Sequence, residues 1–215
     1  MTDYSTARRH MVDSQVRPSD VTDQRVISAM LEVPRERFAP PAAAALAYLD
    51  QDLAVSAARR LLKPMVLAKL INAADLAATD RVLVVGCATG YSAAVFANFA
   101  GQVIALEEDA SLAKTAQTAL AGVANVSVVS GPLTAGWVQG GPYDVILLEG
   151  ATEVEPQAFC SQLKNGGRLV CVLGSAPNAK AMVYRRSGAE LGGRAIFDAA
   201  AALLPGFGKT PVFAF

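Results

Sequence analysis

The chain has 215 residues, of which 53% are hydrophobic, and its 19 lysines and arginines balance 19 aspartates and glutamates. This length suits one domain with a full core. No long basic run is present, which argues against a nucleic-acid partner, and no apolar run is long enough to span a membrane. The mean hydropathy of +0.33 fits a buried sheet with alanine-rich helices, and a homodimer interface is a second explanation.

Cysteine and histidine, the usual ligands of zinc, are scarce. Cys87, Cys160 and Cys171 lack a zinc-site spacing and lie in apolar contexts, so we expect reduced thiols in a cytoplasmic protein. The first residues lack the apolar core of a signal peptide, which favours the same location. His10 is the only histidine, so a histidine base and a multi-histidine site are disfavoured, and we expect no metal.

The first third of the chain is predicted to be mainly helical. Thr22 is a candidate N-cap for a helix over 22–31, and Pro34 ends that segment. Residues 51–61 lack clear periodicity. A helix over 64–74 begins with Pro64, which suits a first helical turn. We therefore expect a helical extension over residues 1–62, packed on an α/β domain over 63–215.

Strands and helices then alternate. Apolar runs predict strands over 81–85, 102–107, 126–130, 143–148 and 167–173, with helices near 91–100, 110–120 and 156–163. This order predicts an α/β fold with a doubly wound, mostly parallel sheet and helices on both faces. Segments 180–186 and 194–203 read as a C-terminal antiparallel hairpin, joined by a turn within 187–193.

The most informative motif is a glycine turn after the first strand. Gly86 and Gly90 let the backbone approach a ligand closely, and the helix from about Tyr91 points its N–H groups there. Glu107 ends the second strand, where a nucleoside-binding fold holds ribose hydroxyls. Any doubly wound domain needs a tight turn here, and Glu107 can be a solvated strand-end acid. The combination nevertheless predicts an adenosine-like cofactor.

Two cofactor classes fit such a site. A dinucleotide fold needs Gly-x-Gly-x-x-Gly, and this loop fails that register at Ala88 and Tyr91. A nicotinamide oxidoreductase is therefore disfavoured. The expected terminal hairpin is instead typical of Rossmann-like S-adenosylmethionine-dependent methyltransferases.

Several motifs resemble protein-L-isoaspartate (D-aspartate) O-methyltransferases. The N-terminal ones are RRHMVDSQ at 8–15, VTDQRV at 21–26, VPRERFAP at 33–40 and AYLD at 47–50. Gly131, Gly136-Trp137, PYDVI at 142–146 and QLKNGGRLV at 162–170 continue the likeness, which covers nearly the whole chain. The resemblance implies a cytosolic enzyme, often monomeric, that methylates isoaspartyl carboxylates with S-adenosylmethionine and releases S-adenosylhomocysteine. The implied partner is a protein or peptide that carries a carboxylate.

The chain departs from the family pattern at clustered positions. The family segment Gly-x-Gly-Gln-Thr-Ile-Ser-x-Pro pairs without gaps with residues 56–64, which places the active-site serine on Leu62 and a threonine on Arg60. On strand one, Val84 occupies the position of a family acid, and Ala88 occupies that of the middle glycine of the loop. After strand three, Gly131-Pro-Leu133 replaces Gly-Asp-Gly. After strand four, Glu149 replaces a small residue. We expect each lost polar contact, at Val84 and Pro132, to weaken cofactor binding about tenfold.

The resemblance assigns candidate sites residue by residue. Cofactor-binding candidates are Gly86, Cys87, Ala88, Gly90, Tyr91, Glu107, Leu133 and Glu149. The candidate substrate segment comprises Arg59, Arg60, Leu62 and Pro64. Its two arginines can bind a carboxylate or form a solvated basic face, and the latter is the favoured interpretation. Likewise, Glu149 can attract the sulfonium of the cofactor or lie in solvent. No catalytic residue is identified, because Leu62 has no hydroxyl.

Two functions remain open at this point. The first is S-adenosylmethionine-dependent methyl transfer to a carboxylate, impaired or directed to another acceptor. The second is a catalytically inactive relative that serves as a binding or assembly module.

Overall fold

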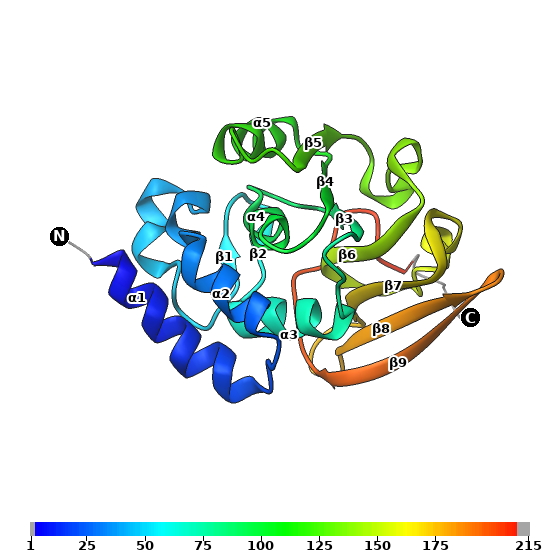
Figure 1. The fold of residues 1–215 in the computed structure, drawn as a ribbon, viewed down its shortest axis with the longest axis horizontal. Coiled ribbons are helices and arrows are strands. Elements are labelled where there is room, and N and C mark those ends of the chain that lie inside the picture. Colours follow the sequence, from blue (N-terminus) through cyan, green and yellow to red (C-terminus); the bar gives the residue numbers. More distant parts are fainter. Residues whose placement is uncertain (1–2, 210–215) are drawn as a thin grey trace, which may run out of the picture.

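The computed structural model describes residues 3–209. Its centre is a seven-stranded sheet in the order β5-β4-β3-β6-β7-β8-β9. The strands are β3 (Arg81–Val85), β4 (Gln102–Glu107), β5 (Val126–Ser130), β6 (Tyr143–Thr152), β7 (Leu163–Leu173), β8 (Lys180–Ser187) and β9 (Glu190–Asp198). β3 to β7 pair in parallel, and β7, β8 and β9 pair antiparallel. The expected mostly parallel sheet with a terminal hairpin is confirmed (Figure 1).

The strand order reverses between β3 and β6. From β3 the chain moves outward to β4 and β5, then returns to place β6 on the other side of β3. Ligands of open α/β sheets bind beyond the carboxyl ends of the strands at such a switch point. Gly86 follows β3 there, and Glu149 lies near the end of β6, which has a register irregularity between Leu147 and Ala151.

Alternating strand residues divide the core into two layers. Val82, Val84 and Val145 face a cluster that includes residues of all four of the first helices, α1 (Tyr4–Met11), α2 (Gln24–Glu32), α3 (Pro64–Ala74) and α4 (Tyr91–Ala97). Leu83 and Ile146 face a second cluster with Leu133 and Leu204. α5 (Ala110–Ala119) packs beside β4 and β5. The N-terminal segment thus shares one core with the sheet, and its division from the rest after residue 62 stays a prediction.

Several predicted boundaries are wrong for local reasons. α2 is capped by Asp23, not Thr22, because the Asp23 side chain accepts the Arg25 backbone N–H at 2.8 Å. The segment expected as a helix over 156–163 is a 3-10 helix, Gln157–Gln162. Residues 51–61 contain a short hairpin of β1 (Leu53–Ala54) and β2 (Arg60–Leu61).

The terminal hairpin starts its second strand earlier than expected. Ser187 pairs with Glu190, so the turn is Gly188-Ala189, and β9 ends at Asp198 rather than 203. Gly193 reads as a turn residue in the sequence but lies within β9. A Cβ at Gly193 would clash with the ring of Tyr184, so this glycine allows an aromatic side chain to lie on the strand.

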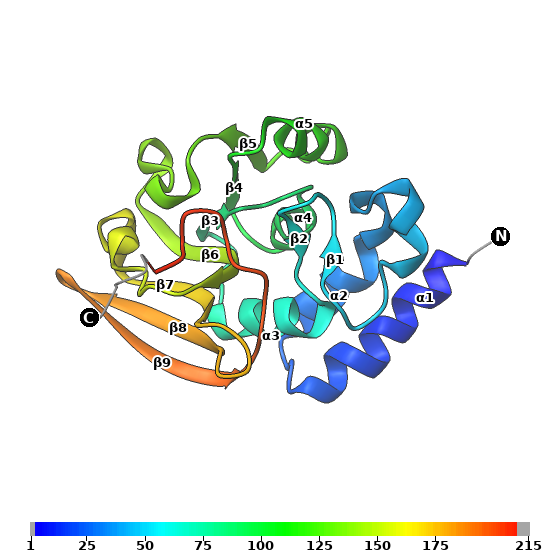
Figure 2. The same cartoon turned by 180° about the vertical axis from the view of Figure 1, so that it is seen from behind.

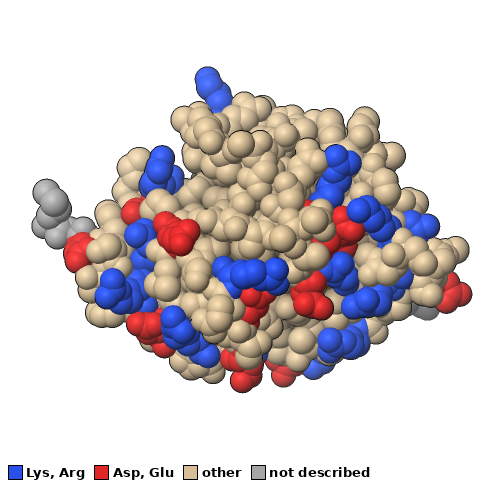
Figure 3. Space-filling model, viewed as in Figure 1, with Lys and Arg blue, Asp and Glu red and all other residues tan. Residues whose placement is uncertain are grey.

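Among residues 3–209, no helix has the length and apolar character that crossing a membrane requires. Figure 3 shows basic and acidic side chains interspersed over the face seen in Figure 1. In the same part of the chain, no three His, Cys, Asp or Glu residues are grouped to hold a metal ion.

Candidate cofactor site

The turn after β3 is held against the end of β4. The backbone N–H groups of Gly86 and Cys87 donate to the Leu106 carbonyl at 2.8 and 3.0 Å. Gly86, Ala88 and Gly90 have φ of 77°, 50° and 98°, the left-handed region that favours glycine. Ala88 adopts it with a side chain, at a steric cost that the glycine of the family pattern would avoid.

Glu107 is fully buried at the end of β4 and faces this turn. One carboxylate oxygen accepts the backbone N–H groups of Glu108 and Asp109, at 3.0 and 3.2 Å. The other accepts the Ala88 N–H at 2.7 Å. The alternative that Glu107 is a solvated strand-end acid is therefore wrong. These three backbone donors fix the carboxylate beside the glycine turn.

Arg59 reaches the same carboxylate from the β1–β2 hairpin. Its Nη2 donates to the second Glu107 oxygen at 3.2 Å and to the Gly86 carbonyl at 2.5 Å. The Arg59 and Glu107 side chains are 5% and 0% exposed, so this is a buried ion pair. The favoured interpretation of Arg59 as part of a solvated basic face is wrong. The same interpretation fits Arg60, whose side chain is exposed in β2.

A C-terminal segment closes the site from the other side. The Ala151 N–H donates to the Ala202 carbonyl at 2.8 Å, and the Leu204 N–H donates to the Ala151 carbonyl at 2.9 Å. Figure 2 shows this red segment passing over β6. A Cβ at Gly86 would meet Leu204 Cδ2 at 2.9 Å and would also clash with Arg59 Nη2. Other groups approach the Gly86 backbone closely, as expected, but these groups are side chains of the same chain and not a ligand.

Glu149, at the end of β6, is buried beside the same turn. Ser92 Oγ donates to its Oε2, while its Oε1 has no hydrogen-bond partner among the described residues. Burial raises the pKa of this carboxyl to about 8, and the Ser92 hydrogen bond and the positive charge of Arg59 oppose that rise. The alternative that Glu149 lies in solvent is wrong, because its carboxyl is enclosed. The raised pKa favours the protonated form of this carboxyl at neutral pH.

Arg35 and Tyr91 complete this buried polar cluster. The Arg35 guanidinium lies 4.6 Å from the Tyr91 ring centroid, and its Nη2 donates to the Leu62 carbonyl at 2.8 Å. Arg35 Nη1 and the Tyr91 hydroxyl are buried, and neither has a hydrogen-bond partner within residues 3–209. Burial lowers the pKa of Arg35 and raises that of Tyr91 to about 12. Buried polar atoms without partners mark places where a polar ligand or water completes the site.

The other candidates serve mainly as packing. Cys87, Ala88 and Leu62 are buried, and Leu133 belongs to the second hydrophobic cluster. Pro64 opens α3 without a side-chain cap. Leu62 therefore offers a buried apolar side chain where the family pattern has its serine.

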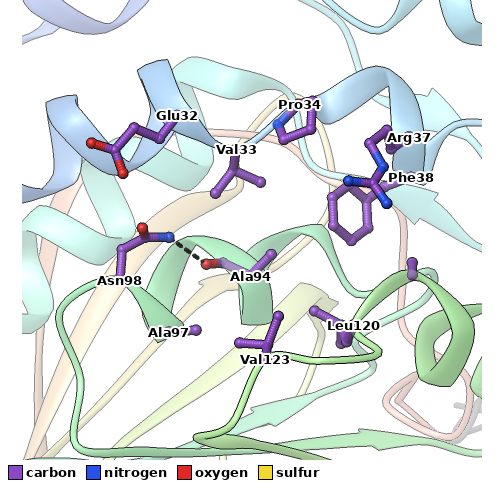
Figure 4. A pocket seen from close by; sticks show the side chains of 11 residues that line it. Glu32, Val33, Pro34, Arg37, Phe38, Ala94, Ala97, Asn98, Leu120 and Val123 are labelled. Atoms are coloured by element: carbon purple, nitrogen blue, oxygen red, sulfur yellow. Dashed lines mark hydrogen bonds between the residues drawn. The ribbon is translucent and has the colours of Figure 1, made fainter.

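Open space is found elsewhere on the surface. Figure 4 shows a cavity of 280 Å³ between the end of α2 and the helices α4 and α5. Val33, Phe38 and Leu120 line it, and Asn98, which donates to the Ala94 carbonyl at 2.8 Å, lies at its edge. None of the candidate cofactor residues is among its lining residues.

Comparison with known proteins agrees with this geometry. The sequence model of the family described as protein-L-isoaspartate(D-aspartate) O-methyltransferase matches residues 6–197. The chain belongs to this family. Protein-L-isoaspartate O-methyltransferase 1 of Rhodopseudomonas palustris (strain HaA2) is 38% identical over 184 residues, covering 85% of this chain and 75% of the relative. A protein-L-isoaspartate O-methyltransferase of Methylorubrum extorquens is 40% identical over 173 residues, covering 80% and 76%.

Solved structures show the same fold. A protein-L-isoaspartate O-methyltransferase structure superposes with a TM-score of 0.80 at 24% identity, covering 94% of this chain and 67% of the other. A putative family member from Plasmodium falciparum, in complex with S-adenosyl-L-homocysteine, gives a TM-score of 0.76 at 16% identity, with 95% and 99% covered. Protein-L-isoaspartate O-methyltransferases use S-adenosylmethionine and act on isoaspartyl residues of proteins.

The chemical groups of this site suit S-adenosylmethionine, but other side chains occupy the space that the cofactor would need. Glu107 is the acceptor that ribose hydroxyls need, and the turn from Gly86 to Gly90 is shaped for close approach. Arg59 and Leu204 fill the volume beside these groups. In the described structure, side chains of the chain itself therefore occupy the place beside Glu107.

Sequence reasoning missed three residues of this site. Arg35 belongs to the motif VPRERFAP and is a fully buried cation. The motif indicated the family, but nothing in it indicated that this arginine is buried. Ser92 follows the candidate Tyr91 and has no distinctive pattern. Leu204 comes from a segment whose path over the sheet no local signal indicates.

Proposed function

We propose that this chain transfers a methyl group from S-adenosylmethionine to a carboxylate of a protein or peptide. Gly86, Gly90 and Glu107 would hold the adenosine part. The observation that carries the proposal is the buried Glu107 carboxylate beside the glycine turn, at the switch point of a sheet of the methyltransferase type.

The chemistry asks little of the protein beyond positioning. When bound, the cofactor supplies an electrophilic methyl group on a sulfonium. The acceptor carboxylate is already ionised at neutral pH, so no general base is needed. The protein must bring oxygen and methyl into line and exclude water. The absence of histidine beyond His10 is compatible with this reaction.

The acceptor would be held without the family's serine. Leu62 is 2% exposed and has no hydroxyl. Arg60 is exposed in β2 and can attract an acidic peptide at a distance. A close ion pair with the attacking oxygen would slow transfer, because the charge it stabilises disappears in the transition state.

The proposed partner is therefore a protein or peptide with an accessible carboxylate, isoaspartyl residues being the family's acceptor. Figure 3 supports the exclusion of nucleic acid for the face it shows, since that face has no continuous basic patch. A cytoplasmic location completes the proposal, and cell fractionation tests it. Size measurement in solution decides between a monomer, as is frequent in the family, and a homodimer.

A catalytically inactive binding module is the second candidate. The buried Leu62 and the side chains beside Glu107 favour it, because both remove features that the reaction uses. In this case the fold would persist without methyl transfer.

Calorimetry with S-adenosylmethionine and S-adenosylhomocysteine separates the two candidates. Methyl transfer predicts that both bind with a dissociation constant well below 1 mM, which corresponds to about 4 kcal/mol. Labelled methyl groups should then appear on an isoaspartyl peptide and not on the same peptide with aspartate. Binding without label on either peptide would favour the second candidate or another acceptor. Binding weaker than 1 mM for both compounds would contradict the proposed function.

A further inference from the structure

The Glu107 carboxylate has no free acceptor position for a ligand. A carboxylate offers about four lone-pair sites on its two oxygens. Within the described residues, four N–H donors occupy them: the backbone groups of Ala88, Glu108 and Asp109, and Nη2 of Arg59. A ribose hydroxyl can therefore bind Glu107 only after one of these donors has left.

The four donors differ in how easily they can leave. Ala88 belongs to the turn that Leu106 holds, and Glu108 and Asp109 continue directly from β4. Displacing any of these three would mean rebuilding the backbone at the end of a central strand. Arg59 is the side chain of the set, so only its rotamers need to change.

The Arg59 side chain can move without unfolding its hairpin. The backbone of the turn is held independently, since the Val55 and Ser56 N–H groups donate to the Arg59 carbonyl at 3.0 and 3.2 Å. Ala57 and Ala58 beside it are exposed, so solvent is within reach of the swung-out side chain. Arg59 Nε is buried and finds no hydrogen-bond partner in the described part of the chain. Such a buried donor is unfavourable, and departure of the side chain relieves it.

We infer that Arg59 competes with the cofactor for Glu107 and is displaced from it on binding, so that residue 59 sets the cofactor affinity. The inference rests on the proposed function. While Arg59 is bound to Glu107, its Nη2 supplies the hydrogen bond that a ribose hydroxyl would supply to this carboxylate. Part of the binding free energy is then spent on breaking the buried ion pair, and the apparent affinity falls accordingly.

The variant Arg59→Gln tests the inference by calorimetry with S-adenosylhomocysteine. Glutamine stands at this position in the family segment that pairs with residues 56–64, and it carries no charge to compete for Glu107. We expect the dissociation constant to fall at least tenfold relative to the wild type. Arg60→Gln is the matched control, because Arg60 is adjacent but exposed, and its dissociation constant should equal that of the wild type.

A second measurement uses the wild-type protein and does not depend on how the variant folds. Phenylglyoxal modifies accessible arginines, and mass spectrometry of peptides locates the modified residue. Arg59 should be protected in the free protein and modified when S-adenosylhomocysteine is saturating, while Arg60 should be modified in both states. Protection of Arg59 at saturation would overturn the inference.

The outcomes separate the inference from the proposed function. Equal and tight binding by the wild type and Arg59→Gln would overturn the competition and leave the function intact. Failure of both proteins to bind below 1 mM would overturn the function, and the inference with it. Binding below 1 mM by the wild type, with binding at least tenfold tighter by Arg59→Gln and unchanged by Arg60→Gln, would support both.

Discussion

The ends of β4 and β6 each bury a glutamate beside the glycine turn, and the two carboxyl groups meet opposite surroundings. Glu107 accepts three backbone N–H groups and forms an ion pair with Arg59. Among the residues that the structure describes, Glu149 accepts a hydrogen bond from the Ser92 hydroxyl, and its other oxygen has no partner. The comparison shows that the supply of donors, rather than burial as such, decides whether a buried carboxyl is a charged anchor or a neutral group.

The largest expected effect comes from removing the titration of Glu149. Its pKa is raised from 4.5 to about 8, so the folded state holds the proton more tightly than the unfolded chain does. The stability from this group is present below pH 4.5 and is lost as pH rises through about 8. Glu149→Gln cannot titrate, so between pH 4 and pH 9 its free energy of unfolding should rise by about 4 kcal/mol relative to the wild type.

Urea unfolding at several pH values measures this difference. Glu155→Gln is the matched control, because Glu155 lies exposed shortly after β6, and its pH profile should follow that of the wild type. Parallel profiles for the wild type and Glu149→Gln would show that Glu149 titrates normally, and the contrast with Glu107 would then disappear.

The second prediction concerns the charge of Glu107. Glu107→Gln takes the anion out of the buried ion pair and leaves a neutral amide beside the three backbone N–H donors. The free energy of unfolding should therefore fall by about 3 kcal/mol, even where the Arg59 side chain swings out to solvent. Urea unfolding at pH 7 measures the change, and Glu108→Gln, at an exposed neighbour, should change it little. A loss below about 1 kcal/mol, as for a solvent-screened pair, would mean that Arg59 is not confined beside Glu107.

The smallest expected effect concerns the backbone strain at Ala88, one of the donors to Glu107. Ala88 donates its N–H to Glu107 from the left-handed region, at φ of 50°. Ala88→Gly should raise the free energy of unfolding by about 0.5 to 1 kcal/mol, because relief of the strain outweighs the added freedom of the unfolded chain. Thermal unfolding checks this. Ala94→Gly, within α4, should instead destabilise by about 1 kcal/mol, and a loss of stability in both variants would show that Ala88 is unstrained.

The sequence predicted the sheet well because buried parallel strands are continuous apolar runs. The runs at 81–85, 102–107 and 126–130 coincide with β3, β4 and β5. It predicted the hairpin poorly, since Gly192 and Gly193 look like turn residues although Gly193 serves to seat the Tyr184 ring. A glycine in the sequence indicates that the backbone can either turn or be approached closely by another group. It does not indicate which of the two occurs in the fold.

The sequence predicted where the site lies, but not that Arg59 and Leu204 occupy it. Gly86 and Glu107 follow apolar runs, so their place at the switch point could be inferred. The burial of Arg59 could not, because adjacent arginines in a segment without periodicity resemble a solvated face, and only the β1–β2 pairing directs one inward and the other outward. The covering by Leu204 depends on a long-range contact to β6 that no local pattern encodes.

The ion pair between Arg59 and Glu107 also constrains how this lineage can change. Once arginine occupies position 59, loss of Glu107 removes the partner of a buried cation as well as the acceptor of three backbone N–H groups. Selection for a folded protein therefore retains the glutamate even without selection for a ligand. A glutamate preserved here among descendants that share the arginine is thus not by itself a sign of enzymatic activity.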